Sequence, residues 1–158
     1  MPALREALSG AGYSAVSTYL QSGNVVLCSD RAPTELEQDC ERLIAERFGL
    51  EVPVLARTAS ELAEIVSADP LGELAADPRR YQVTFLAEPL PAGRVEELAA
   101  LAAGQERLEA LGRELFAWHP DGQARSKLAA ALAAASLGVK ASARNWTTVT
   151  TLAQMTRA

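Results

Sequence analysis

The chain has 158 residues, of which 49% are hydrophobic, and this length suits one domain, or two small subdomains, with a buried core. Its 20 acidic and 15 basic residues give a net charge of -5, and the pI near 5.0 argues against a surface that binds nucleic acid over most of its area. The sequence has two cysteines and no Cys/His cluster, so we expect no disulfides, metal or cofactor. It has no signal-peptide pattern and no apolar run of roughly 18 residues, so we expect a cytoplasmic protein without a membrane span.

The first 70 residues alternate between helical and strand patterns. Two short apolar runs on either side of a Gln-Ser-Gly-Asn turn predict a β-hairpin. An apolar stripe that ends at Gly49 predicts a helix, and Thr58 with Glu61 forms a capping box before another. In chain order we predict a helix over residues 2–8, strands over 16–20 and 25–28, a helix over 33–48, a strand over 52–55 and a helix from Thr58 to the Asp69-Pro70 stop.

The second half repeats this alternation after a polar, alanine-rich stretch. Residues 71–80 are predicted to link an N-terminal α+β subdomain (1–70) to a C-terminal one with a closing helix (81–158). Strands over 107–111 and 114–118 are predicted to pair across Gly112-Arg113, because Gly at the first central position suits a type II′ turn. The remaining predictions are a strand over 81–86 and helices over 93–103, 126–137 and from about Asn145.

This order of elements predicts an α+β fold with antiparallel sheets. Each half resembles a ferredoxin-like unit in which one terminal strand is absent.

The stretch from Trp118 to Thr150 carries the most suggestive chemistry. From residue 122 to 158 there are five basic residues and no acidic one, whereas residues 1–112 hold 18 acids and 9 bases. Helix N-termini present free N–H groups and a positive dipole end, so phosphate and carboxylate groups bind there readily. We therefore predict a phosphate site at two helix starts, built from Arg125, Ser126, Lys127, Arg144 and Asn145.

A structural alternative stays open for each of these residues. Ser126 and Asn145 are also ordinary N-cap residues, and the cations are equally suited to solvation or to pairing with the acidic part of the chain. Trp146 could stack on a base of a nucleic-acid ligand, but its place on the apolar stripe of the last helix favours the core. Gln21, Ser22 and Asn24 either present polar groups to a ligand from the hairpin tip or simply form the turn.

His119 is the only histidine. A Ser–His–Asp site would need Asp121 as the orienting acid and Ser126 or Ser22 as the nucleophile. No Gly-x-Ser-x-Gly motif is present, and Asp121 is better placed to form a turn with Gly122. We assign no catalytic residue and leave the question of enzymatic activity open.

Three separated stretches resemble one protein family. TYLQSGNVV at residues 18–26, PDG at 120–122 followed by RSKL at 125–128, and ARNW at 143–146 followed by TVT at 148–150 together resemble the DUF1697 family of bacterial proteins. The resemblance covers essentially the whole chain, and it implies two related α+β subdomains and no established biochemical activity. The family typically begins with an extra strand and a loop of the form RGINVGG, which have no counterpart here, so the first subdomain is expected to be one strand short. Two explanations stay open, a misassigned start of the sequence and a genuine loss of the strand. The family also commonly has Asn and Lys where this chain has Thr147 and Thr151, which removes one charge from the predicted anion site.

Three functional hypotheses follow. The first is a module that binds a phosphate-bearing small molecule, such as a nucleotide, or the end of a nucleic acid, at the two basic helix starts. The second is an enzyme of unknown reaction that uses the same pocket, with Ser22 or His119 contributing. The third is an interaction protein whose basic C-terminal face docks an acidic partner, or the acidic N-terminal half of a second copy in a homodimer.

Overall fold

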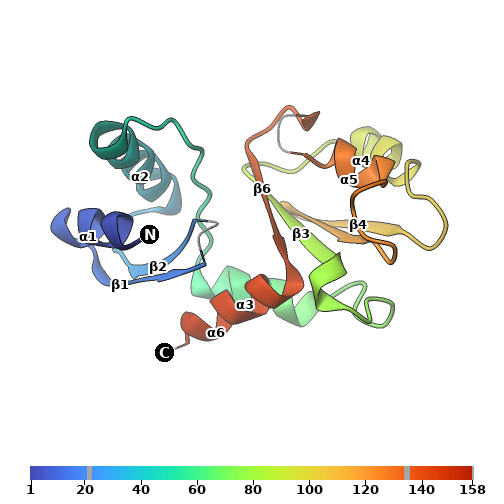
Figure 1. Cartoon of the computed structure of the whole chain (residues 1–158), viewed down its shortest axis with the longest axis horizontal. Coiled ribbons are helices and arrows are strands. Elements are labelled where there is room, and N and C mark those ends of the chain that lie inside the picture. Colours follow the sequence, from blue (N-terminus) through green and yellow to red (C-terminus); the bar gives the residue numbers. More distant parts are fainter. Residues whose placement is uncertain (21–22, 134–135, 158) are drawn as a thin grey trace. The chain divides into compact units, whose positions relative to one another are not determined.

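The protein folds into two compact units. The computed structural model describes residues 1–20, 23–133 and 136–157. Unit 1 comprises Met1–Ala63 with Thr151–Ala158, and unit 2 comprises Glu64–Thr150 (Figure 1). Both combine helices with an antiparallel sheet, so the predicted α+β fold of two ferredoxin-like subdomains is confirmed.

Unit 1 is built from a hairpin and its flanking helices. The β1–β2 pair has the predicted antiparallel arrangement, with Ser17 opposite Val26. Gly49 ends the long helix α2 in the left-handed conformation (φ 66°), which a residue without a Cβ adopts at little cost. The elements are α1 (Pro2–Gly10), β1 (Ser14–Tyr19), β2 (Asn24–Cys28) and α2 (Pro33–Phe48), followed by α3 (Ala59–Ala68), which begins in unit 1, and α6 (Trp146–Met155), which ends in it.

The helix starts in unit 1 follow sequence rules closely. Pro33 occupies the first turn of α2, where its missing N–H is not needed. Before α3, the Thr58 N–H donates to Glu61 Oε2 (2.7 Å) and the Glu61 N–H donates to Thr58 Oγ1 (3.1 Å). This reciprocal pair confirms the predicted capping box.

The predicted strand over residues 52–55 is wrong. Residues 51–58 contain no strand, and two of their backbone N–H groups bond to side chains of α2. The Val54 N–H donates to Glu41 Oε1 (2.9 Å), and the Ala56 N–H donates to Glu37 Oε1 (2.8 Å). An apolar, β-branched sequence therefore stays extended without joining a sheet.

Unit 2 is a complete ferredoxin-like domain. Its four strands lie in the order β4-β5-β3-β6, and all three neighbouring pairs are antiparallel. The predicted hairpin has the observed bounds, and Gly112 at its turn has a φ of 56°, as a type II′ turn requires. The elements are a 3-10 helix η1 (Pro78–Arg80), then β3 (Tyr81–Leu86), α4 (Ala92–Ala99), β4 (Arg107–Leu111), β5 (Glu114–Trp118), α5 (Lys127–Ala131) and β6 (Ala141–Asn145).

Strand β6 corrects the prediction that the second half lacks a terminal strand. Its sequence, ASARN, has no β-branched or aromatic residue, so no strand pattern is visible in it. Pairing with the buried strand β3 makes it a strand, with Ala143 opposite Thr84 and Ala141 opposite Leu86. Helix α5 is also shorter than the predicted helix over 126–137, part of which (134–135) lies outside the described residues.

The core of unit 2 lies on both faces of its sheet. On one face, aliphatic side chains of the strands pack with those of α4 and α5, with Leu98 and Leu128 fully buried. On the other face, the rings of Tyr81 and Trp146 stack at 4.7 Å, and Phe116 lies 6.4 Å from both. Residues 71–80, predicted as a linker, lie within unit 2, where the buried Leu71 donates its N–H to the Tyr81 hydroxyl (3.2 Å).

Candidate functional site

One end of the unit 2 sheet gathers four chain segments. The register places Tyr81 opposite Trp118, Trp118 opposite Arg107, and Gln82 opposite Asn145. The starts of β3 and β4 therefore meet the ends of β5 and β6. The segments after β5 and before β3 are also joined directly, because the His119 N–H donates to the Arg80 carbonyl (3.0 Å).

A buried polar network lies at this end of the sheet. Glu106 lies just before β4. Its Oε2 accepts a hydrogen bond from the Ser126 hydroxyl (2.6 Å) and also contacts His119 Nδ1 (2.6 Å). Its other oxygen accepts the Ala103 N–H (3.1 Å). Ser126 in turn caps α5 by accepting the Ala129 N–H (3.0 Å), which confirms its predicted role as an N-cap. One carboxylate thus ties the two ends of the β4–β5 hairpin to the start of α5.

The side chains of this network are buried, so their hydrogen bonds matter for the stability of the fold. His119 is 1% exposed and Glu106 is 7% exposed, so neither group can exchange its partner for bulk water. Burial by itself would raise the pKa of Glu106, but the hydrogen bonds from His119, Ser126 and the Ala103 backbone outweigh it and hold that pKa below its ordinary value of 4.5. The charged carboxylate is therefore the form that the fold stabilises.

The lowered pKa of Glu106 gives a pH dependence of known sign. A carboxyl whose folded-state pKa lies below its unfolded value adds stability above the unfolded pKa, and that contribution is lost as the pH falls through the folded pKa. We expect the difference in unfolding free energy between the wild type and Glu106→Gln to be largest near neutral pH and to shrink below about pH 4. Urea titrations from pH 7 to pH 3 measure it, and a difference that stays constant over this range contradicts the assignment.

The order of groups in the network differs from that of a hydrolase relay. In a Ser–His–acid site the imidazole stands between the nucleophile and the carboxylate and takes the proton of the serine. Here the carboxylate stands in the middle, and the Ser126 hydroxyl donates to Glu106. Asp121 lies in the predicted turn, which the Gly122 N–H closes on the His119 carbonyl (2.9 Å). Glu106, His119 and Ser126 are thus arranged as a structural anchor between the hairpin and the start of α5.

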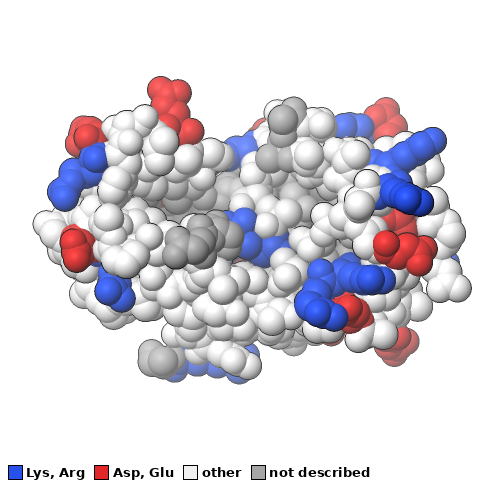
Figure 2. All heavy atoms as spheres, in the orientation of Figure 1, with Lys and Arg blue, Asp and Glu red and all other residues white. Residues whose placement is uncertain are grey.

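Two cationic residues flank the anchored Ser126, and two more begin or precede strands at the same end of the sheet. Arg125 and Lys127 flank it and are exposed, and within the described part of the chain neither has an acidic side chain at ion-pair distance. Arg107 begins β4 and bonds the Glu106 carbonyl (2.7 Å), while Arg80 bonds the Pro120 carbonyl. In Figure 2, Lys and Arg atoms gather, with some acidic ones among them, over the region where Figure 1 draws the start of β3.

The second predicted helix start is arranged differently from the prediction. Arg144 lies on β6, and the helix begins only at Trp146. Arg144 is half-buried, where its guanidinium donates to Ser142 Oγ (2.7 Å) and the Ala143 carbonyl (2.8 Å), and burial lowers its pKa. Strand alternation puts it on the sheet face opposite that of Asn145, whose Oδ1 caps α6 by accepting the Thr148 N–H (3.0 Å).

The remaining candidate residues have structural partners or lie outside the description. The indole of Trp146 stacks on Tyr81, as the core interpretation expects. Asn24 is buried in unit 1, and its side-chain amide donates to the Tyr19 carbonyl (2.9 Å) across the hairpin. Gln21 and Ser22 lie outside the described residues. The structure thus brings together Arg125, Ser126 and Lys127 with Glu106 and His119, and it places Asn24 in the other unit.

Glu106 is absent from the sequence-based candidates, although the hairpin contains a signal for it. The two-residue turn fixes the register, with Leu111 opposite Glu114 and Arg107 opposite Trp118. One further step along the same ladder puts Glu106 beside His119. The link to Ser126 carries no such signal, because it depends on how α5 packs against the sheet.

The described residues were also surveyed for other kinds of site. None of their helices is long and apolar enough to cross a membrane. Among the same residues, no group of three or more His, Cys, Asp or Glu side chains is arranged to hold a metal ion.

Comparisons with known proteins assign the family. The family described as "Protein of unknown function (DUF1697)" matches residues 1–116. The chain belongs to this family. A solved structure with the same fold, the conserved bacterial protein SP0830 from Streptococcus pneumoniae, is 18% identical with a TM-score of 0.72, and the match covers 100% of this chain and 89% of that one. No curated protein matches the sequence. The DUF1697 assignment agrees with the resemblance seen in the sequence, and the likeness to SP0830 supports the fold.

Proposed function

We propose that this DUF1697 protein binds a phosphate-bearing ligand at the basic end of the unit 2 sheet. The observation that carries the proposal is the pair Arg125 and Lys127, two exposed cations held on either side of a serine that the buried Glu106 anchors. Because Ser126 is fixed by bonds to both Glu106 and Ala129, the backbone that carries the two cations is fixed as well. A fixed backbone reduces the entropic cost of ordering the two side chains around an anion.

The surrounding charges support an anionic ligand. Arg80 and Arg107 lie at the same end of the sheet. Of the acids nearby, Glu106 is buried, Asp77 is within 3.3 to 4.0 Å of Arg79 and Arg80, and Asp121 lies exposed in the turn after His119. Phosphate groups accept charge-assisted hydrogen bonds from Arg and Lys, and these bonds are about twice as strong as neutral ones. The buried aromatic residues of the sheet favour a small ligand over stacked bases, because Tyr81, Phe116 and Trp118 expose at most 7% of their surface.

A double substitution with a charge-matched control tests this proposal. Arg125→Ala with Lys127→Ala should weaken the binding of pyrophosphate or ATP by roughly tenfold or more, since two charge-assisted contacts are lost. Arg5→Ala with Arg47→Ala removes the same charge from exposed positions in unit 1 and should leave binding unchanged. Isothermal titration calorimetry at low and moderate salt measures both pairs, with a short single-stranded RNA as a third probe. Equal losses in the two double variants, or no binding by the wild type, refute the proposed site.

A further inference from the structure

The turn that follows α3 holds Asp69 in a strained backbone conformation. The Asp69 N–H donates to the Ile65 carbonyl (3.3 Å) at the end of the helix, and Asp69 has a φ of 33°. A positive φ is uncommon for a residue that has a Cβ, and a residue before proline is ordinarily extended. The strain is therefore located at the Asp69-Pro70 peptide bond.

The side chain of Asp69 packs against its own turn. A Cβ at Gly72 would overlap the Asp69 carboxyl group, so a residue without a side chain is needed there. Oδ1 of this carboxyl group is buried and has no hydrogen-bond partner within the described part of the chain. The Gly72 N–H donates to the Asp69 backbone carbonyl (3.2 Å) and polarises it. A carboxyl oxygen without a partner and a polarised carbonyl thus belong to the same residue.

The Tyr81 hydroxyl bonds this carboxyl group and keeps its proton. Burial is the main cause that raises the pKa of Tyr81, and the bond to Asp69 raises it further. The hydroxyl therefore stays a neutral donor that holds the carboxyl group in place.

Proline after an aspartate selects one kind of reaction. Because Pro has no N–H, its nitrogen cannot attack the side-chain carboxyl group and lose a proton to give a neutral cyclic imide. The opposite attack remains, in which a carboxyl oxygen adds to the backbone carbonyl carbon of the same residue. Carboxylates act as nucleophiles in this way, and a nucleophile held close to its target reacts as if it were highly concentrated.

The chain contains a second Asp-Pro bond, Asp77-Pro78, in a relaxed setting. Asp77 is extended (φ -115°, ψ 110°), and its Oδ1 accepts the Arg79 N–H (3.0 Å) while Oδ2 accepts from the Arg79 guanidinium (3.3 Å). Its backbone carbonyl also accepts an N–H, that of Arg80 (3.0 Å). The two bonds therefore differ in the strain of the backbone and in the freedom of the carboxyl group.

We propose that the folded chain cleaves its own Asp69-Pro70 bond in mild acid. Oδ1 of Asp69 forms a bond to the Asp69 backbone carbonyl carbon, the bond from this carbon to the Pro70 nitrogen breaks, and the nitrogen takes a proton from the acidic solvent. A water molecule then opens the cyclic anhydride, which leaves Asp69 as a C-terminal residue and Pro70 as a new N-terminus. The backbone strain is released as the bond breaks, so the fold favours this bond over Asp77-Pro78.

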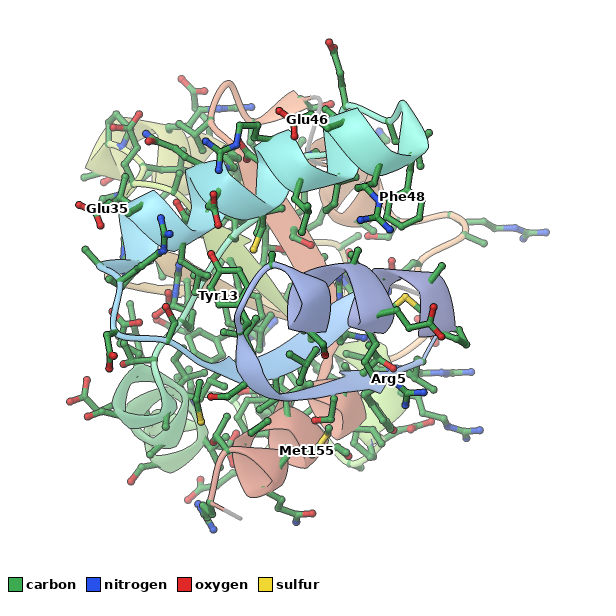
Figure 3. The ribbon with its side chains drawn as sticks, turned by 90° about the vertical axis from the view of Figure 1, so that its left-hand side faces the viewer. Arg5, Tyr13, Glu35, Glu46, Phe48 and Met155 are labelled. Atoms are coloured by element: carbon green, nitrogen blue, oxygen red, sulfur yellow. The ribbon has the colours of Figure 1, made fainter. Side chains whose placement is uncertain are left out.

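The cut would divide unit 1 between two pieces. Met1–Ala63 lies on the first piece, and Thr151–Ala158 lies on the second. The second includes Met155 at the end of α6 (Figure 3). Unit 1 is then held together by noncovalent contacts between separate chains, so its stability falls on dilution.

Mass spectrometry of the full chain under denaturing conditions, after incubation at about pH 5, tests this proposal. In the folded chain, which circular dichroism verifies, the cut after Asp69 should form at least about fivefold faster than the cut after Asp77, because strain of the usual size changes a rate by this factor or more. In urea at the same pH the fold is lost, and the two rates should become similar. Equal rates in the folded chain, a preference that persists in urea, or no cut in the folded chain overturns the proposal.

Matched substitutions identify the attacking group. Asp69→Asn replaces the carboxylate by a weaker nucleophile and should slow the cut after residue 69 at least about tenfold. Asp77→Asn makes the same change at the other Asp-Pro bond and should leave the cut after Asp69 unchanged. An undiminished cut after residue 69 in Asp69→Asn overturns the proposal. The comparison of the folded and the urea-unfolded wild type decides the question even where a variant does not fold.

Discussion

We expect Glu106→Ala to lower the free energy of unfolding by about 3–5 kcal/mol, the usual cost of removing one partner from a buried charged or strongly polar pair. The substitution leaves His119 Nδ1 and the Ser126 hydroxyl without the oxygen that both contact at 2.6 Å. A buried group without its partner costs about 1–3 kcal/mol, and here there are two. Urea unfolding monitored by circular dichroism at pH 7 measures the loss.

Glu109→Ala is the matched control for this substitution. Glu109 is the same residue type on β4, but its side chain is exposed, so the change should stay within about 0.5 kcal/mol. Glu106→Gln should fall between the two, because the amide keeps an oxygen acceptor and loses the charge. A loss below about 1 kcal/mol for Glu106→Ala would mean that the network contributes little to folding.

Local sequence signals predicted the parts of the fold that local chemistry determines. The Gly112-Arg113 turn predicted the β4–β5 hairpin with its observed bounds, and Gly49 and the Thr58–Glu61 box predicted a helix end and a helix start. Each of these features depends on residues within a few positions of one another. Turns and helix caps of this kind form largely independently of the rest of the fold, so the local sequence is enough to predict them.

The errors occurred where the outcome depends on a distant partner. Residues 141–145 look unlike a strand and become one because β3 offers a buried edge. Residues 52–55 look like a strand and do not become one, and the N–H groups of Val54 and the following Ala56 bond to side chains of α2. Arg144 was assigned to a helix start for the same reason, since the strand before α6 was not recognised. Whether a segment forms a strand depends on the strand it pairs with, so the sequence of the segment alone does not decide it.

The candidate site was predictable in part for similar reasons. Ser126 and Asn145 cap helices as their residue types suggest, and the cluster of bases after residue 122 is visible in the sequence. Arg144 is separated from Arg125 and Lys127 because strand alternation turns it to the sheet face opposite the one on which α5 packs. No spacing in the sequence shows this, because it requires β6 and its register.

Phe116→Ala should cost about 3–5 kcal/mol, whereas Phe48→Ala, the same substitution in unit 1, should cost less than about 1 kcal/mol. Phe116 is 1% exposed in the centre of the unit 2 sheet, where it packs near Tyr81 and Trp146, and its removal leaves a cavity between strands that pair on both sides. Phe48 is already 38% exposed, so little apolar contact is lost. Urea unfolding of both variants measures the difference.

The difference in apolar burial between the two units predicts which unit unfolds locally more easily in the wild-type protein. Outside the elements that cross between units, unit 1 buries few apolar side chains, with Leu8 and Cys40 among them, and a segment with few buried contacts opens at a lower free energy. Native-state hydrogen exchange should therefore show the amides of β1 and β2 exchanging at lower denaturant than those of β3 and β5. Equal protection of the two sheets would contradict this expectation, because unit 1 would then be as stable as unit 2.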